Sequence, residues 1–302
     1  MTRKVSIIIN NYNKKPYLKR CLDSVLEQTY ENWEIIFWDD NSTDDGRNWA
    51  FHYLNMTCPD KFYCYDTKQL IDNPNFDLPL GVVRWMAAQK AKGDYIAFLD
   101  ADDYWHPRKL EKQMKLFEEN HDMKLVFSDC QYFADKIIQV DNYPAWTSEQ
   151  YTFGTFHEKY RPLMDNDPFM GLLLGYKLKP WLNSNFMPMS TLVFEREAFF
   201  KVMGKSTHYT SGEDFDWLFK MTAKYDCGLV PEVLSYYRIN VRGSVNNQIS
   251  MSLKAQWNEI DVIKKAKGYR ELTRWQTVRF YFRLFVMYSK LIFKQCQEVK
   301  VL

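Results

Sequence analysis

The chain has 302 residues, of which 46% are hydrophobic and 17% aromatic; this composition excludes a disordered protein and allows one large domain or two closely packed ones. With 40 Lys and Arg against 38 Asp and Glu, the charge balance gives no reason to propose a nucleic-acid-binding protein.

The first part of the chain alternates between short apolar runs and segments with helical spacing of apolar residues. We predict strands at residues 5–9, 34–38, 62–65, 95–99 and 123–127 and helices at 16–26, 80–92 and 107–119. Strands that alternate with helices imply βαβ units and a mostly parallel sheet. The sequence therefore predicts the α/β class.

The pattern changes after residue 130. Residues 130–185 are rich in Pro, Tyr, Trp and Asn, which predicts irregular structure over the sheet. Because long irregular stretches in compact domains are often functional, we expect substrate specificity to lie there. A strand at 190–195 and a helix at 212–224 follow, and from about residue 250 the pattern is helical to the end.

Polar residues follow three of the predicted strands directly, after Ile9, Trp38 and Leu99. In open α/β sheets, ligands bind at the carboxyl ends of the strands. We therefore expect these three clusters, although far apart in sequence, to meet at one site.

The cluster after Leu99 places Asp100, Asp102 and Asp103 within four positions, where like charges repel. A divalent cation would relieve this repulsion. Asp100-x-Asp102 has the oxygen ligands that suit Mg²⁺ or Mn²⁺, which take carboxylates together with substrate phosphates and water. In the alternative interpretation the acids cap the next helix or face solvent, and Asp103 fits that alternative best.

Three other segments also allow two interpretations. Residues 39–44, DDNSTD, form a turn, or they present a carboxylate to a base or sugar. Arg84 is an ordinary exposed residue of an apolar helix, or it contacts a diphosphate or nucleotide. Glu213 and Asp214 stabilise the N-terminus of their helix through its dipole, or they supply a general base.

Together these features resemble the family 2 glycosyltransferases, which have the GT-A fold. The matching segments are VSIIINNYNKKPYLKRCLDSVLEQTYENWEIIFWDDNSTDDG, GVVRWMAAQKAKGDYIAFLDADD, GEDFDWLFKM and SYYRINVRGSV. Each motif alone is weak, but their order and spacing are specific. The resemblance implies a Rossmann-like, mostly parallel mixed sheet flanked by helices, with a C-terminal helical extension.

The resemblance also implies an organisation of the chain. Residues 1–120 would be the nucleotide-sugar-binding half of the GT-A domain, and residues 121–249 the acceptor-binding and catalytic-base half. Residues 250–302 would form the helical extension.

By this resemblance, the residues of the nucleotide pocket are Asn10, Asn11, Tyr12, Asn13, Asp40 (on the base), Arg84 and Asp100 (on the ribose, or assisting the metal). Asp102 would ligate Mn²⁺ or Mg²⁺. Asp214 would be the catalytic base, and Glu213 would support it.

Two departures from the family pattern stand out. Trp85 follows Arg84 where the family often has Asn, and Asn240 stands near the place of a His that can reach the metal or diphosphate. A third protein ligand to the metal is therefore in doubt, and Arg242 and Ser244 become the candidates for the diphosphate contact.

The resemblance implies an inverting transferase that moves a sugar from a nucleotide-sugar, most commonly a UDP-sugar, to a hydroxyl of a glycan or lipid-linked acceptor in bacterial surface polysaccharide synthesis. A nucleotidyltransferase is one alternative, but the first strand is followed by NNYNKKPYL, with no glycine-rich loop. A non-catalytic sugar-nucleotide or glycan-binding module is another, but binding alone does not require Asp214 as a base.

The location of the protein is inferred from cysteines and targeting signals. The six cysteines are scattered with no CxxC pair, and the segment MTRKVSIII turns polar too soon for a signal peptide. No uncharged apolar run reaches the roughly 18 residues of a membrane span. We expect a cytoplasmic protein.

The tail, residues 277–294, is mostly apolar. Its basic residues Arg279, Arg283, Lys290 and Lys294 are spaced to share one helical face. Such a face could meet lipid headgroups at the inner side of the plasma membrane as a peripheral contact. Alternatively the helix packs on the domain or on a second subunit, which would make a homo-oligomer.

Overall fold

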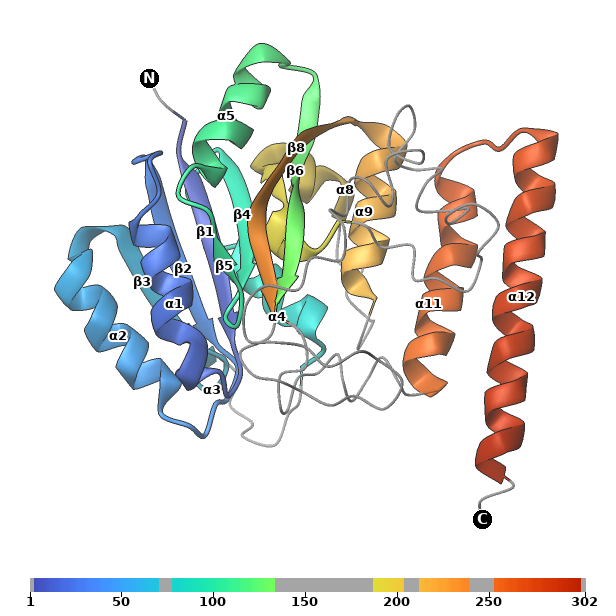
Figure 1. Cartoon of the computed structure of the whole chain (residues 1–302), viewed down its shortest axis with the longest axis horizontal. Coiled ribbons are helices and arrows are strands. Elements are labelled where there is room, and N and C mark those ends of the chain that lie inside the picture. The colour runs from blue at the N-terminus through green and yellow to red at the C-terminus, as the bar shows by residue number, and fades with distance from the viewer. Residues whose placement is uncertain (1–2, 71–77, 134–186, 204–211, 239–252, 300–302) are drawn as a thin grey trace.

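The computed structural model describes residues 3–70, 78–133, 187–203, 212–238 and 253–299. The described part contains one eight-stranded sheet with strand order β3-β2-β1-β4-β7-β6-β8-β5 (Figure 1). The strands are β1 (Val5–Asn11), β2 (Trp33–Asp39), β3 (Phe62–Asp66), β4 (Tyr95–Asp100), β5 (Tyr104–Trp105), β6 (Met123–Phe133), β7 (Val193–Glu195) and β8 (Asp226–Arg238).

The sheet is mixed. β3, β2, β1 and β4 are parallel neighbours, whereas β7 runs antiparallel to both β4 and β6. β8 is parallel to β6 and antiparallel to β5. The predicted α/β class and mixed sheet are confirmed. The predicted boundary at residue 120 lies between α5 and β6, and both sides of it contribute strands to this one sheet.

Both faces of the parallel half are buried, which explains why its strands have continuous apolar runs. Alternation places Val5, Ile7 and Ile9 in one core and Ile8 in the other. The first core also takes side chains from α1 (Lys15–Leu26), α2 (Gly46–Thr57) and α5 (Lys109–Glu119). The second takes side chains from α4 (Leu80–Ala88), α8 (Arg196–Met203), α9 (Glu213–Lys224), α11 (Leu253–Ala266) and α12 (Arg274–Val299).

Short elements complete the described structure. They are the helix α3 (Thr67–Leu70) and the 3₁₀ turns η1 (Pro59–Lys61), η2 (Met189–Thr191) and η3 (Lys267–Tyr269).

The sequence pattern did not reveal β8, because Gly228 and Pro231 argue against a strand. The structure accommodates the proline in an irregularity of the β6–β8 ladder: Val230 pairs with Ser128, and Val233 pairs with the next residue of β6. Proline has no N–H to donate, so it is tolerated where the ladder is interrupted.

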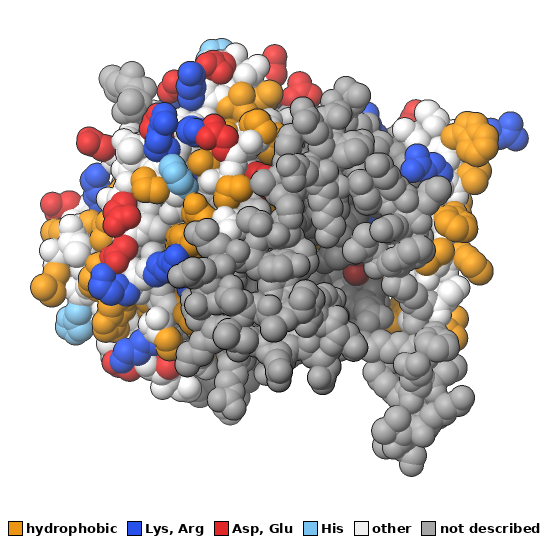
Figure 2. Space-filling model, in the orientation of Figure 1, with side chains coloured by type: hydrophobic (Ala, Val, Ile, Leu, Met, Phe, Trp, Pro, Cys, Tyr) orange, Lys and Arg blue, Asp and Glu red, His pale blue; other side chains and the backbone are white. Residues whose placement is uncertain are grey.

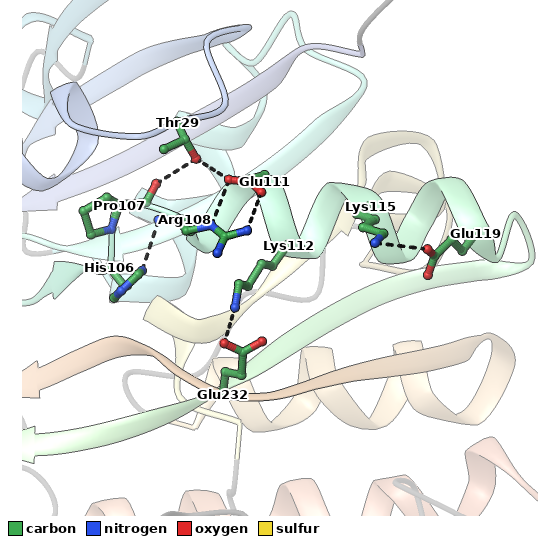
Figure 3. Close-up of polar contacts among 9 residues, drawn as sticks. All are labelled: Thr29, His106, Pro107, Arg108, Glu111, Lys112, Lys115, Glu119 and Glu232. Atoms are coloured by element: carbon green, nitrogen blue, oxygen red, sulfur yellow. Dashed lines mark hydrogen bonds and ion pairs between the residues drawn. The ribbon is translucent and has the colours of Figure 1, made fainter.

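The segment after the acidic cluster, including the start of α5, contacts Thr29 before β2 and Glu232 of β8 (Figure 3). The Thr29 backbone N–H donates to the Pro107 carbonyl at 2.9 Å, and the Thr29 hydroxyl donates to Glu111 at 2.7 Å. Lys112 forms an ion pair with Glu232 of β8. These contacts fix the β5–α5 connection without any acid of the cluster.

The interpretation of Asp103 as a helix cap or a solvent-facing residue is wrong. Its side chain is buried, and it accepts hydrogen bonds from the Ser190 hydroxyl at 2.5 Å and the Arg238 backbone N–H at 2.8 Å. Asp103 instead joins the turn after β4 to η2 and to the end of β8.

The predicted C-terminal helices are present as α11 and α12, the outermost elements beside α9 (Figure 1). The predicted basic face of the tail is wrong at Arg283, which is 1% exposed because it lies on the inner side of α12 between Phe280 and Leu284. Burial lowers the pKa of the Arg283 guanidinium to about 10, while Glu259 raises it. In the described segments no helix is long and apolar enough to cross a membrane.

Candidate functional site

The carboxyl ends of β1, β2 and β4 lie side by side, as the sequence predicts. In the sheet register, Asn10 pairs with both Trp38 and Asp100, and Asn11 pairs with Asp39. Amide and carboxylate side chains from three distant segments therefore line one edge of the sheet.

The turns after β1 and β2 are joined by side-chain hydrogen bonds. Asn11 Nδ2 donates to Asp39 Oδ1 at 2.6 Å and to Ser42 Oγ at 3.0 Å. Asn13 Oδ1 accepts from the Thr43 backbone N–H at 2.7 Å, and Asn13 itself has a φ of 52°, which Asn tolerates better than most residues. Asn11 and Asn13 thus hold the shape of this corner of the site.

Unlike Asn11 and Asn13, the side chains of Asn10 and Tyr12 do not hold these turns together in the described structure. Asn10 Nδ2 is buried and has no hydrogen-bond partner among the described residues, and Tyr12 is 48% exposed. A buried donor without a partner costs about 1–3 kcal/mol, so an acceptor on a bound ligand would stabilise this position.

Asp40 is oriented by a chain of hydrogen bonds. Trp38 Nε1 donates to Thr67 Oγ1 at 2.9 Å, and the Thr67 hydroxyl donates to Asp40 Oδ1 at 2.9 Å. Sequence patterns offer no reason to select Thr67, because a single Thr after a short strand carries no specific signal.

Arg84 connects two of the acidic segments. From α4 its NH2 group donates to Asp100 Oδ1 at 2.6 Å, and its NH1 group donates to Glu213 Oε1 at 2.7 Å. Burial lowers the pKa of the Arg84 guanidinium, but the charges of Asp100, Glu213 and Asp214 raise it above its ordinary value. Of the two interpretations of Arg84, the exposed residue is wrong, and a direct nucleotide contact stays a prediction.

Glu213 and Asp214 begin α9, and their environments differ. Glu213 is buried on Arg84; burial raises the pKa of its carboxyl to about 7, while Arg84 lowers it and Asp214 raises it. Asp214 is partly buried, and burial raises the pKa of its carboxyl against the lowering effect of Arg84. The paired acid Glu213 is thus held in an ion pair, whereas Asp214 Oδ1 accepts the Phe215 backbone N–H at 2.8 Å.

Asp102 has a basic partner and a fixed backbone. Lys14 Nζ lies 2.8 Å from Asp102 Oδ2, and Arg238 Nε donates to the Asp102 carbonyl at 2.7 Å. The guanidinium of Arg238 stacks over Tyr17, with its carbon 4.4 Å from the ring centre. The sequence did not assign a role to Lys14, before α1, or to Arg238, at the end of β8, because a lone basic residue has no specific signal.

The carboxylates at this edge are hard oxygen ligands that suit a divalent cation, and their partial exposure makes them accessible to one. The side chains of Asp100 and Asp102 are 28% and 15% exposed. No group of three His, Cys, Asp or Glu residues suited to a metal occurs in the described ranges. A cation here would therefore need oxygen atoms from its substrate, as Mg²⁺ and Mn²⁺ commonly do.

Two predicted elements of the site lie outside the described residues. These are the diphosphate candidates Arg242 and Ser244, together with most of the irregular segment 130–185. A cavity of about 530 Å³ opens between α1 and β5, lined in part by Arg20, Tyr104 and Tyr236, and it contains none of the predicted site residues.

The fold and the site define the chain's class before any relative is considered: an α/β sheet of GT-A type, with acids at its strand ends and a second acidic pair across the site. Residues 6–179, more than half of the chain, match the profile of glycosyl transferase family 2. The chain belongs to this family.

Solved structures agree with this fold. S. aureus TarS 1–349, solved in complex with UDP-GlcNAc, gives a TM-score of 0.64 at 17% identity, covering 94% of this chain and 73% of that one. The mannosyltransferase PcManGT from Pyrobaculum calidifontis, solved with GDP-Man and Mn²⁺, gives 0.56 at 16% identity, covering 100% and 81%.

A curated relative is similar in sequence. The enzyme named UDP-Glc:alpha-D-GlcNAc-diphosphoundecaprenol beta-1,3-glucosyltransferase WfaP, from Escherichia coli, is 39% identical over 132 residues, which are 44% of this chain and 47% of that protein. The matches span less than half of the length of the first curated relatives.

The close approach of α4 and α9 gives a first test. A Cβ on Gly81 would lie 2.7 Å from Cβ and 2.8 Å from Cγ of Glu213. Gly81→Ala should therefore push Glu213 away from Arg84 and lower the free energy of unfolding by about 1–3 kcal/mol, measured by urea denaturation. Gly268→Ala is the control, because a Cβ there meets nothing within 4 Å. Equal effects of the two substitutions would contradict this account.

The pKa of Glu213 gives a second test. The value rises from 4.5 to about 7 on folding, so the folded protein binds this proton more tightly than the unfolded chain. The resulting stabilisation is complete below about pH 4.5 and is lost as the pH rises through about 7. Glu213→Gln cannot titrate, so its unfolding free energy should fall less than that of the wild type over this interval. Parallel pH profiles for the two proteins would show that Glu213 has no raised pKa.

Proposed function

We propose that this protein is an inverting glycosyltransferase that transfers a sugar from a nucleotide-sugar to a hydroxyl of an acceptor. The observation that carries the proposal is the Arg84 bridge, which fixes the acidic start of α9 relative to Asp100 at the end of β4. Donor-binding and proton-accepting groups are thereby held at one edge of the sheet, in a chain that belongs to glycosyl transferase family 2.

The donor half of the site is assigned to the ends of β1, β2 and β4. Asp40, oriented by Thr67, would accept from the base, and the buried amide of Asn10, which has no partner among the described residues, would donate to the nucleotide. Asn11 and Asn13 would shape the pocket, Tyr12 would cover it, and Asp100 would hold the ribose. A UDP-sugar is the proposed donor, as the names of WfaP and of the TarS complex specify UDP compounds for those proteins.

Asp214 is proposed as the base. An acceptor hydroxyl must lose its proton as it attacks the anomeric carbon, and a carboxylate within reach can accept it. Glu213 has the same chemistry but is committed to Arg84 at 2.7 Å, so it would position the start of α9 rather than accept the proton. The raised pKa of Asp214 makes its carboxylate a stronger base than a solvated aspartate.

Asp102, assisted by Asp100, would hold Mn²⁺ or Mg²⁺. When bound, such a cation stabilises the negative charge of the departing diphosphate. PcManGT, which has the same fold, was solved in complex with Mn²⁺. Arg242 and Ser244 remain the proposed diphosphate contacts from this chain.

The acceptor is proposed to be a glycan or lipid-linked hydroxyl in bacterial surface polysaccharide synthesis, at the inner face of the plasma membrane. The name of WfaP specifies a diphosphoundecaprenol-linked acceptor for that relative. The organisation proposed from sequence, with donor residues in 1–120, acceptor and base residues in 121–249 and a helical extension in 250–302, agrees with this assignment of roles.

The substitution Asp214→Asn separates an enzyme from a binding module. It keeps the size of the side chain and an oxygen that can accept the Phe215 N–H, but it removes the proton acceptor. Turnover of a UDP-sugar should fall by about 10²–10⁴-fold, while donor affinity measured by calorimetry stays within a few-fold. Asp60→Asn, at an exposed position of η1, is the control and should keep full activity. Normal turnover by Asp214→Asn together with a dead Glu213→Gln would move the base to Glu213.

The substitution Asp102→Asn tests the metal assignment. It removes one charged ligand with little change of shape, so activity should fall at least about 100-fold. Mn²⁺ affinity, measured by calorimetry with UDP present, should fall as well, whereas UDP affinity without metal should not. Asp261→Asn, on the exposed side of α11, is the matched control. Full activity of Asp102→Asn in the presence of EDTA would remove the metal from the proposal.

A further inference from the structure

The outer face of α12 is apolar and exposed. Of the ten large hydrophobic side chains that are exposed in the described structure, six lie on this helix, with exposed fractions between 52% and 78%. They are Trp275, Val278, Tyr281, Phe282, Phe285 and Ile292. Spacings of three and four residues place them along one side of the helix, here named the outer face of α12. Figure 2 shows their hydrophobic surface along the outer edge of the molecule.

The orientation of this face is fixed by the opposite side of the helix. Phe280, Leu284 and Leu291 are buried in the core that α11 also enters. Tyr281, which belongs to the outer face, is also tied down, because Lys267 Nζ donates to its hydroxyl at 2.6 Å. Trp257 of α11 packs edge-on against Tyr288, with 5.8 Å between ring centres. The helix therefore cannot rotate its outer face inward without losing these contacts.

The charge around the outer face is mainly positive. Residues 272–297 contain no Asp or Glu, and Arg274 and Arg279 are both exposed. In the preceding stretch, exposed Lys264, Lys265 and Arg270 outnumber exposed Asp261 and Glu271. This distribution is complementary to an anionic surface.

A second copy of the chain fits this face less well than lipid does. A second copy that offered the same face would present no acid from residues 272–297 to pair with Arg274 and Arg279. Helix–helix seams favour Leu, Ile and Val, whereas Trp275, Phe282 and Phe285 are bulky aromatics. Aromatic and basic side chains together are typical of helices that lie in a membrane interface.

We propose that the outer face of α12 binds an anionic phospholipid membrane, with the helix lying in the interface and the exposed arginines near the headgroups. The contact is made by the aromatic side of the helix, opposite Arg283. The inference deepens the proposed function, because α12 packs on α11, and η3 beyond α11 is tied to α9 by the Tyr269 hydroxyl, which donates to Asp216 Oδ1 at 2.9 Å. The helix that carries Asp214 would thereby be held near a lipid-linked acceptor.

The apolar part of the contact is tested by flotation of the full chain with phosphatidylglycerol–phosphatidylcholine vesicles. The double substitution Phe282→Ser/Phe285→Ser should lower vesicle affinity at least about tenfold, because two aromatic side chains leave the lipid. Phe51→Ser is the matched control, since Phe51 is 45% exposed on α2 and remote from α12 in sequence. Unchanged circular dichroism would show that the double variant is folded.

The charged part is tested with the same vesicles. Arg274→Gln and Arg279→Gln should each lower affinity about fivefold, and added salt should weaken binding of the wild type. Lys115→Gln, at an exposed position of α5, should have no effect. Vesicles of phosphatidylcholine alone should bind more weakly than the anionic ones.

Three results would overturn the proposal: no flotation of the wild type with either vesicle, equal flotation of the double Phe variant, or a wild-type dimer in solution that becomes monomeric in that variant and binds no vesicles. The assay contains no donor or acceptor, so its outcome is separate from that of the transferase proposal. If the Asp214→Asn protein floats normally but does not turn over UDP-sugar, the membrane proposal still stands. If the double Phe variant still hydrolyses UDP-sugar, its active site is intact and the transferase proposal is unaffected.

Discussion

The arrangement of the site depends on one buried guanidinium. Arg84 lies between Asp100 and Glu213, which are 16 and 129 residues away in sequence, and it donates to both within 2.7 Å. A buried charge needs ionic partners, because leaving one unpaired typically costs several kcal/mol. The planar fork of arginine also fixes the direction of each hydrogen bond, so it sets where the two carboxylates stand relative to each other.

Two further features allow that arrangement. Gly81, one helical turn before Arg84, lets α4 approach the side chain of Glu213 at a distance that any Cβ would block. On the other side of the acidic turn, the Ser190 hydroxyl donates to Asp103, and the Asp100 backbone N–H donates to Ser190 Oγ at 3.2 Å. The turn is therefore held from α4 on one side and from η2 on the other, which makes the site a product of both halves of the sheet.

The sequence was sufficient for the features that follow from local patterns. The apolar runs of β1, β2 and β4 predicted their strands, and the carboxyl-end rule predicted that Asn10 and Asp100 meet, as they do in the register. It was insufficient where a partner is distant: nothing local indicates that Arg84 is buried or that Thr67 orients Asp40. The same holds for Arg283, because helical spacing shows which residues share a face but not which face is packed.

The acidic turn also shows how repulsion between neighbouring carboxylates is partly relieved by their hydrogen-bond and ion-pair partners. Each acid has its own partner: Asp100 has Arg84, Asp102 has Lys14, and buried Asp103 accepts from Ser190 and from the Arg238 backbone. Arg84 and Lys14 offset only part of this charge, because burial and then the charges of Asp102 and Asp100 raise the pKa of the Asp103 carboxyl well above its usual range. A cation bound at this turn would relieve the repulsion that remains. The proposal of a divalent cation is also supported by the hard oxygen ligands of Asp100 and Asp102 and by their partial exposure, which leaves them accessible to a cation that arrives with its substrate.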